Sequence, residues 1–225
     1  MRLAVMADIH SNLHALEAAA GLIRARRPDM VVCAGDVVGY GAFPDECCSI
    51  VEGMCGPCVA GNHDRAAVSG DLSGMNPFAA AAMAWTAKRL GDRSRAFLSS
   101  LEPSCRFDAG GLRASVFHGS PDDPDEYVHE DAVTAGTLLR SGGDIVVMGH
   151  THVPYAKRLG EGLAVNPGSV GQPRDGDPRG SFAVVDTGCM ECEVVRFRYP
   201  VEEAADAIVS AGLPRVLADR LAVGR

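Results

Sequence analysis

The sequence lacks an excess of basic residues and any long apolar run. Its 21 Lys and Arg residues are outnumbered by 29 Asp and Glu residues, which gives a formal net charge of −8. This charge disfavours large nucleic acids as partners, because nucleic-acid binding normally needs a basic surface. No segment approaches the roughly 18 uncharged apolar residues of a membrane span, and the apolar run before Asp8 is too short for a signal peptide. We therefore expect a cytoplasmic protein without a membrane partner.

Repeats, low-complexity tracts and long linkers are also absent. The 225 residues, 47% of them hydrophobic, are enough for one sizeable core, so we expect a single domain over residues 1–225. A phosphate-binding loop with its Lys is missing. The segment "GYGAF" lacks the third glycine and the helix start of a nucleotide-binding loop, which excludes that route to nucleotide binding.

Cysteine is not scarce, but its pattern does not predict a disulfide framework. Eight cysteines without an export signal indicate reduced thiols. Cys47 and Cys48 precede Cys55 and Cys58, whose two-residue spacing is found in dithiol redox sites and in zinc sites. Redox dithiols normally begin a helix, whereas Cys58 begins a predicted strand. Core packing is the favoured interpretation of this cluster, with a redox or metal role as the alternative.

Apolar spacing predicts an α/β fold. The first sixty residues alternate strand and helix, with Asn12 as a helix N-cap, which is typical of a parallel sheet. Further on, short strands alternate with Gly-rich turns. The predicted strands are 2–7, 30–33, 58–60, 113–117, 145–148, 163–165, 182–185 and 193–197; the predicted helices are 12–26, 44–52, 77–101 with a break near Gly91, 131–140 and 201–223.

Polar residues come directly after several of these strands. Ligands gather where the strands of a parallel sheet end, and five of the seven histidines lie at such ends. A lone histidine at a strand end is usually structural, and "GD" and "GN" are common turns, but the joint pattern favours a shared site. The candidate residues are Asp8, His10, Asp36, Asn62, His63, Asp64, His118, His150 and His152.

The residue types in this set are metal ligands. Asp8 with His10, and His150 with His152, are two positions apart, and such residues point the same way in an extended chain. Carboxylate, imidazole and amide ligands together suit Mn²⁺, Fe or Zn²⁺, and no thiolate set indicates structural zinc. Seven candidate ligands exceed the needs of one ion, so we expect two ions with Asp36 as the natural bridge.

Several short motifs resemble those of a known family. Asp8-x-His10, Gly35-Asp36, Gly61-Asn62-His63-Asp64, His118-Gly119 and Gly149-His150-Thr151-His152 look like the motif series of the calcineurin-like metallophosphoesterase superfamily. The segments "DIHSNLHALEA", "GDVVGYGAFPDEC" and "NPGSVGQPRDGDPRG" are similar to a bacterial and archaeal branch described as phosphodiesterases or as relatives of diadenosine tetraphosphatases and protein phosphatases. The resemblance implies a two-sheet β-sandwich flanked by helices, in four αββα layers, with a dinuclear centre at one edge.

Residue roles follow from the same resemblance. His63 would face the substrate, with Asp64 orienting its ring. The cofactors would be two divalent metal ions, manganese first, with iron, zinc, nickel or magnesium as alternatives. Such a pair would supply a hydroxide to attack phosphorus, and His63 would protonate the leaving oxygen. The first metal would be held by Asp8, His10, Asp36 and His152, and the second by Asp36, Asn62, His118 and His150.

Substrate contacts are less specific in sequence. Arg174 is suited to pair with a phosphate and Tyr40 to stack on a ring; an ion pair with a neighbouring carboxylate and simple packing are the respective alternatives. We expect a phosphoric ester hydrolase for a small phosphorylated substrate, with nucleotides or dinucleoside polyphosphates favoured over other mono- and diesters. The alternative functions are a serine/threonine protein phosphatase-like monoesterase and a non-catalytic binding scaffold on the same fold. A homo-oligomer is compatible with all of these functions.

Overall fold

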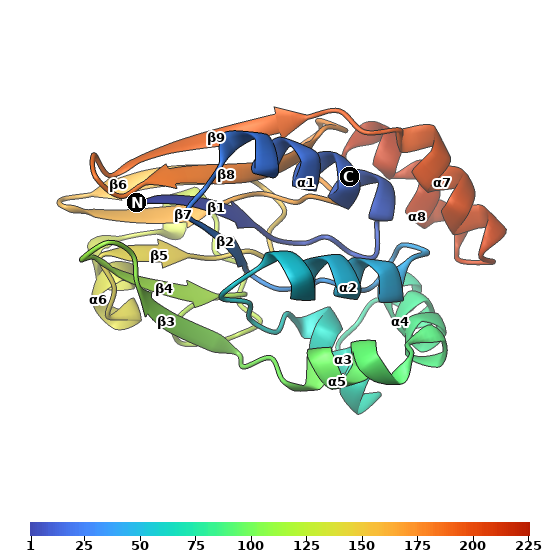
Figure 1. Cartoon of the computed structure of the whole chain (residues 1–225). Coiled ribbons are helices and arrows are strands. Elements are labelled where there is room, and N and C mark those ends of the chain that lie inside the picture. Colours follow the sequence, from blue (N-terminus) through green and yellow to red (C-terminus); the bar gives the residue numbers. More distant parts are fainter.

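The computed structural model describes residues 1–225 as two β-sheets with helices outside them (Figure 1). The strand order is β2-β1-β8-β9 in the first sheet and β3-β4-β5-β7-β6 in the second. The strands are β1 (Arg2–Met6), β2 (Met30–Cys33), β3 (Ser104–Asp108), β4 (Arg113–Phe117), β5 (Ile145–Val147), β6 (Tyr155–Leu159), β7 (Gly162–Asn166), β8 (Gly180–Asp186) and β9 (Glu191–Phe197). The helices are α1 (Leu13–Arg26), α2 (Pro44–Met54), α3 (Asn62–Ser69), α4 (Pro77–Arg89), α5 (Asp92–Ser99), α6 (Ala135–Ser141), α7 (Val201–Ser210) and α8 (Arg215–Asp219), with 3₁₀ turns at Glu130–Ala132 and Leu221–Val223.

Alternating side chains of β1 separate two apolar cores. Leu3 and Val5 pack between the two sheets, whereas Ala4 and Met6 pack against the helices that cover the first sheet. This two-residue period is what an extended strand imposes. A smaller cluster around Met148 covers the outer face of the second sheet, beneath α6. Figure 1 shows α6 on the left and α4, α7 and α8 on the right. The predicted αββα sandwich is confirmed.

Strand pairing is mixed rather than wholly parallel. β1 pairs parallel with β2 but antiparallel with β8. The predicted strand at 58–60 forms only isolated bridges, Cys33 with Cys58 and Val59 with Glu102. The edge strands β3 and β6 were not predicted, because side chains that alternate between half-buried and exposed leave no continuous apolar run in "SCRFD" and "YAKRL".

Helix boundaries follow local chemistry. Asn12 caps α1 as predicted, its Oδ1 accepting from the Ala15 N–H at 3.1 Å. The predicted helix over 201–223 is interrupted, because Gly212 has a positive φ of 75° and Pro214 precedes α8. The helical segment over 77–101 is two helices, α4 and α5, that separate at Gly91. None of the helices has both the length and the apolar composition to cross a membrane.

Candidate metal centre

The candidate ligands lie on loops that leave the strands, where the backbone turns into the left-handed region. These residues have φ values between 51° and 68°: Asp8, His10, Asp36, His150 and His152. Such values are uncommon for residues other than glycine, and clusters of them accompany functional sites. The expected alternation of an extended chain is therefore the wrong explanation for the paired ligands. β1 ends at Met6, and left-handed turns direct Asp8 and His10 to one point.

The first group of candidate ligands surrounds a point between three loops. His10 Nε2 lies 3.1 Å from His152 Nε2 and 3.5 Å from Asp36 Oδ2. Asp8 Oδ1 lies 3.4 Å from His152 Nε2 and 4.0 Å from His10 Nε2. All four side chains are buried. The four atoms therefore converge on one position.

The second group shares Asp36 with the first. Asp36 Oδ2 lies 3.4 Å from His118 Nε2. That nitrogen is also 3.0 Å from His150 Nδ1 and 3.2 Å from Asn62 Oδ1. Asp36 Oδ2 is thus within 3.5 Å of a ring nitrogen from each group, which places a single carboxylate oxygen between the two.

Backbone carbonyls orient the four imidazoles. Their other ring nitrogens lie opposite carbonyl oxygens: His10 Nδ1 at 3.2 Å from Val38, His118 Nδ1 at 2.8 Å from Ala34, His150 Nε2 at 3.1 Å from Asp125 and His152 Nδ1 at 2.5 Å from Gln172. A nitrogen that donates to a carbonyl leaves the inward nitrogen with a free lone pair. This arrangement is the usual support of a metal-binding histidine.

The donor set fits divalent cations. Asp8 Oδ1 is buried without a hydrogen-bond partner, which is costly unless something else satisfies it. Metal–ligand bonds of about 2.1 Å place neighbouring ligand atoms about 3.0–3.4 Å apart in octahedral or tetrahedral geometry. The spacings around Asp36 Oδ2 and the His118 ring nitrogen, 3.0–3.5 Å, match this range.

Metal binding to the metal-free chain is expected to release protons. Burial raises the pKa of Asp8 to about 8. Burial opposes the charge of His118, but the adjacent Asp36 carboxylate outweighs it and raises the His118 pKa to about 10. Both groups hold a proton at pH 7 that a cation must displace. We expect one to two protons released, and affinity rising about tenfold or more per pH unit from pH 6 to 7.5. Calorimetry in buffers of different ionisation enthalpy measures this; release of no protons would contradict it.

His63 and Asp64 begin α3 beside the shared carboxylate. The His63 N–H donates to Asp36 Oδ1 at 2.9 Å, which leaves Oδ2 free to face the ligands. The expected contact of Asp64 with the His63 ring is not formed. Both Asp64 oxygens accept backbone N–H groups instead, from Val38 at 3.1 Å and Gly61 at 3.0 Å. Buried donors need partners, so Asp64 ties the Asp36 loop to the start of α3. Its role is in positioning the loop.

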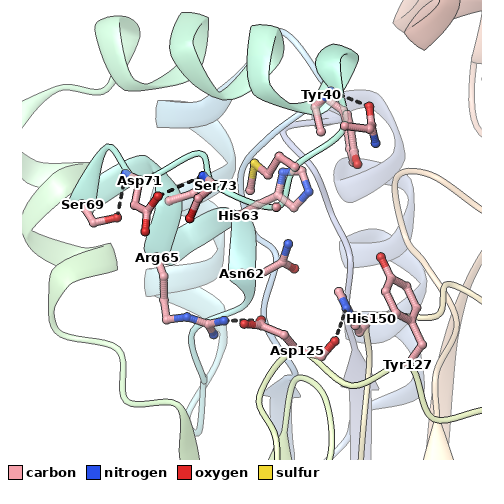
Figure 2. Close-up of a pocket in the computed structure, with 15 residues that line it drawn as sticks. Tyr40, Asn62, His63, Arg65, Ser69, Asp71, Ser73, Asp125, Tyr127 and His150 are labelled. Carbon is pink, nitrogen blue, oxygen red and sulfur yellow. Dashed lines mark hydrogen bonds and ion pairs between the residues drawn. The ribbon is translucent and has the colours of Figure 1, made fainter.

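A cavity of about 610 Å³ opens beside the metal centre (Figure 2). His63 and Asn62 line one wall, and His150 and Tyr127 line the other. The Tyr127 ring stacks on His150, with centroids 3.9 Å apart, while 55% of the residue stays exposed. Sequence reasoning did not identify Tyr127, because it lies in an irregular loop after β4 without a motif of its own.

The two predicted substrate contacts lie together. Tyr40 is buried, and its ring packs 4.7 Å from that of His10 and 4.5 Å from that of His63. Arg174 Nη2 donates to the Tyr40 hydroxyl at 3.3 Å and to Gln172 Oε1 at 3.0 Å. Arg174 has no carboxylate partner, because the nearby Asp175 and Asp177 pair with other arginines. The alternative interpretation of Arg174, an ion pair with a neighbouring carboxylate, is therefore not observed.

The cysteines stand apart from this centre. All eight are free, and none belongs to the two ligand groups or to a third cluster of potential ligand atoms, His10, Asp36 and His63, which lie within 4.8 Å of one another. Cys47 and Cys48 are buried in α2. Burial raises the pKa of the Cys55 thiol, and a hydrogen bond to Cys33 together with burial raises that of Cys58. Raised pKa values disfavour the reactive thiolate.

Comparison with known proteins gives a consistent relationship. Residues 1–189 match the family model described as the calcineurin-like phosphoesterase superfamily domain. The protein MJ0912 of Methanocaldococcus jannaschii, named as uncharacterized, is 35% identical over 99% of this chain and 98% of its own length. The crystal structure of a metallophosphoesterase from Sphaerobacter thermophilus is 35% identical, with a TM-score of 0.86 over 100% of this chain and 99% of that one.

A second solved structure has the same fold at lower identity. The hypothetical protein PH1004 from Pyrococcus horikoshii OT3 is 21% identical, with a TM-score of 0.90 over 100% of this chain and 98% of that one. The family model, the full-length relative and the solved structures all cover the loops that converge on Asp36. This chain belongs to the calcineurin-like phosphoesterase superfamily.

Proposed function

We propose that the protein hydrolyses phosphoric esters with two divalent cations, manganese first among them. The observation that carries the proposal is the position of Asp36 Oδ2, 3.5 Å from His10 Nε2 and 3.4 Å from His118 Nε2. A carboxylate oxygen shared by two ligand groups suits a pair of cations. The name of the Sphaerobacter thermophilus relative, a metallophosphoesterase, supports the same chemistry. When bound, two such cations activate water and neutralise charge on a phosphoryl group.

His63 is the candidate acid for the leaving group. Its side chain lines the cavity (Figure 2), and its ring centroid is 4.8 Å from that of His10. Burial lowers the pKa of His63 to about 4, so the ring is neutral at neutral pH without substrate. A bound phosphate dianion favours the charged imidazolium, because an opposite charge nearby raises the pKa of a base. Substrate binding thus lets His63 hold the proton that the leaving oxygen needs.

The cavity accommodates the organic part of the substrate. Its 610 Å³ lies within the roughly 300–1,000 Å³ of small-molecule sites. The open face of Tyr127 suits an aromatic group such as a nucleobase. We propose a nucleotide or a dinucleoside polyphosphate as the substrate, rather than a large nucleic acid, which the net charge of −8 disfavours.

A substrate panel tests this function. Protein loaded with manganese is assayed against nucleotides, dinucleoside polyphosphates, glycerol 3-phosphate, p-nitrophenyl phosphate and bis-p-nitrophenyl phosphate. The readouts are chromatographic separation of the products for the nucleotides, dinucleotides and glycerol 3-phosphate, and p-nitrophenolate absorbance for the two nitrophenyl esters. We expect hydrolysis that depends on metal, with a KM for nucleotides up to about tenfold below that for glycerol 3-phosphate, which has no ring to stack on Tyr127. Absence of hydrolysis of every compound, with two metals bound per chain, would contradict the proposal and favour a binding scaffold.

A further inference from the structure

Two arginines, Arg174 and Arg220, lie against the ring of Tyr40. The Arg174 guanidinium carbon is 5.8 Å from the centre of the Tyr40 ring, and that of Arg220 is 5.9 Å from it. Arg174 Nε is buried and unpartnered, and Arg174 pairs with no carboxylate. Arg220 Nε donates to the main-chain oxygen of Arg225, the last residue of the chain, at 2.8 Å, and its terminal nitrogens make no hydrogen bond. Both guanidinium groups are partly buried.

Nearby carboxylates are already used by other arginines. Asp175, which follows Arg174 in the chain, pairs with Arg196, and Asp177 pairs with Arg179 at 2.6 Å. Burial and the charge of Arg174 lower the pKa of Arg220, as expected for two cations near each other. Partly buried cations without a counter-charge are unfavourable. The main-chain oxygen of Arg225 contacts only Arg220 Nε, so Arg174 has no counter-charge from the chain.

This arginine pair adjoins the metal centre through Tyr40. The Tyr40 ring lies 4.7 Å from the His10 ring and 4.5 Å from the His63 ring. The Arg174 charge also acts on Asp8, a member of the first ligand group. An anion held by the arginines would therefore belong to a molecule that also reaches the metals.

We propose that Arg174 and Arg220 together bind a second phosphate of the substrate, distinct from the phosphate that is hydrolysed. The inference rests on the proposed function and narrows it to esters or anhydrides with at least two phosphate groups. Guanidinium groups bind phosphate with charge-assisted, often bidentate hydrogen bonds. The free donors of Arg220 and Arg174 Nε offer such bonds, and Tyr40 holds both side chains in place.

Calorimetry with inorganic pyrophosphate and orthophosphate tests the site directly. The full chain is used without metal, because pyrophosphate chelates manganese. We expect wild-type protein to bind both anions at the arginine pair, pyrophosphate the more tightly because it carries more negative charge. Arg220→Gln and Arg174→Gln should each weaken the binding of both anions about tenfold, the loss of one charge-assisted contact. Arg215→Gln is the matched control, because Arg215 begins α8, which ends just before Arg220, but is 81% exposed and pairs with Asp219.

Kinetics with AMP and ADP, which differ by one phosphate, provide the second readout. We expect Arg220→Gln to lower kcat/KM for ADP at least about fivefold more than for AMP, and Arg215→Gln to leave their ratio as in wild type. Equal losses of kcat/KM on AMP and ADP, or binding of pyrophosphate and orthophosphate left unchanged by Arg220→Gln and Arg174→Gln, would overturn the second-phosphate site. If manganese-loaded wild type hydrolysed neither substrate while Arg220→Gln still weakened pyrophosphate binding, the proposed function would fail and the anion site would stand.

Discussion

Replacing Asp36 by Asn is expected to remove bound metal and to lower kcat more than about a thousandfold. In the wild type, the backbone N–H of His63 donates to Asp36 Oδ1 at 2.9 Å, and Asn keeps this acceptor. Asn places an NH₂ group, however, where Asp36 Oδ2 faces His10 and His118. An amide nitrogen has no lone pair for a cation, and the negative charge between the two ligand groups is lost. Metals supply several kcal/mol of transition-state stabilisation, and each 1.4 kcal/mol is about tenfold in rate.

Metal content and activity must be measured on the same samples. Elemental analysis should find fewer than two metals per chain in Asp36→Asn, while circular dichroism shows an unchanged fold. Asp219→Asn is a suitable control, because Asp219 is a mostly exposed carboxylate on α8, paired only with Arg215. A variant at Asp36 that retained two metals and wild-type kcat would show that this carboxylate is not shared between them.

Replacing His63 by Ala is expected to keep the metals and to lower kcat about 10²–10⁴-fold, the usual contribution of a general acid. The His63 side chain lines the cavity, and its Nδ1 contacts Met83 Sδ at 3.1 Å, while both ligand groups can be formed by other residues. Loss of the ring therefore leaves both ligand groups complete. The loss should be larger for an alkyl phosphate than for p-nitrophenyl phosphate, because p-nitrophenolate leaves without a proton.

This dependence on the leaving group separates proton donation from a purely structural role. His129→Ala, at an exposed histidine outside the site, controls for the loss of an imidazole. Equal losses on both substrates would mean that His63 does not protonate the leaving oxygen. Unchanged activity on both, with metal content verified, would remove His63 from the mechanism altogether.

Much of the fold was predictable where local chemistry dominates. Buried strands such as β1 and β5 are short apolar runs. The helix α1 follows directly after Asn12, whose side chain caps it. The edge strands β3 and β6 were not predictable in the same way, because about half their side chains face solvent and no apolar run marks them, although each pairs with the next strand along the chain. Pairing direction in the first sheet was likewise decided by β8, more than 170 positions after β1.

The sequence by itself determined which residues have the chemistry of metal ligands, because imidazole and carboxylate groups directly after apolar strands are recognisable without coordinates. Only the tertiary structure decided how they meet. Asp8 and His150 are 142 positions apart, yet the His150 N–H donates to Asp8 Oδ2 at 3.1 Å. The tertiary structure also showed that the Asp64 carboxylate accepts backbone N–H groups rather than contacting the His63 ring, and that Arg220 lies near Arg174. Such contacts depend on sheet order and left-handed loop turns, which local patterns do not encode.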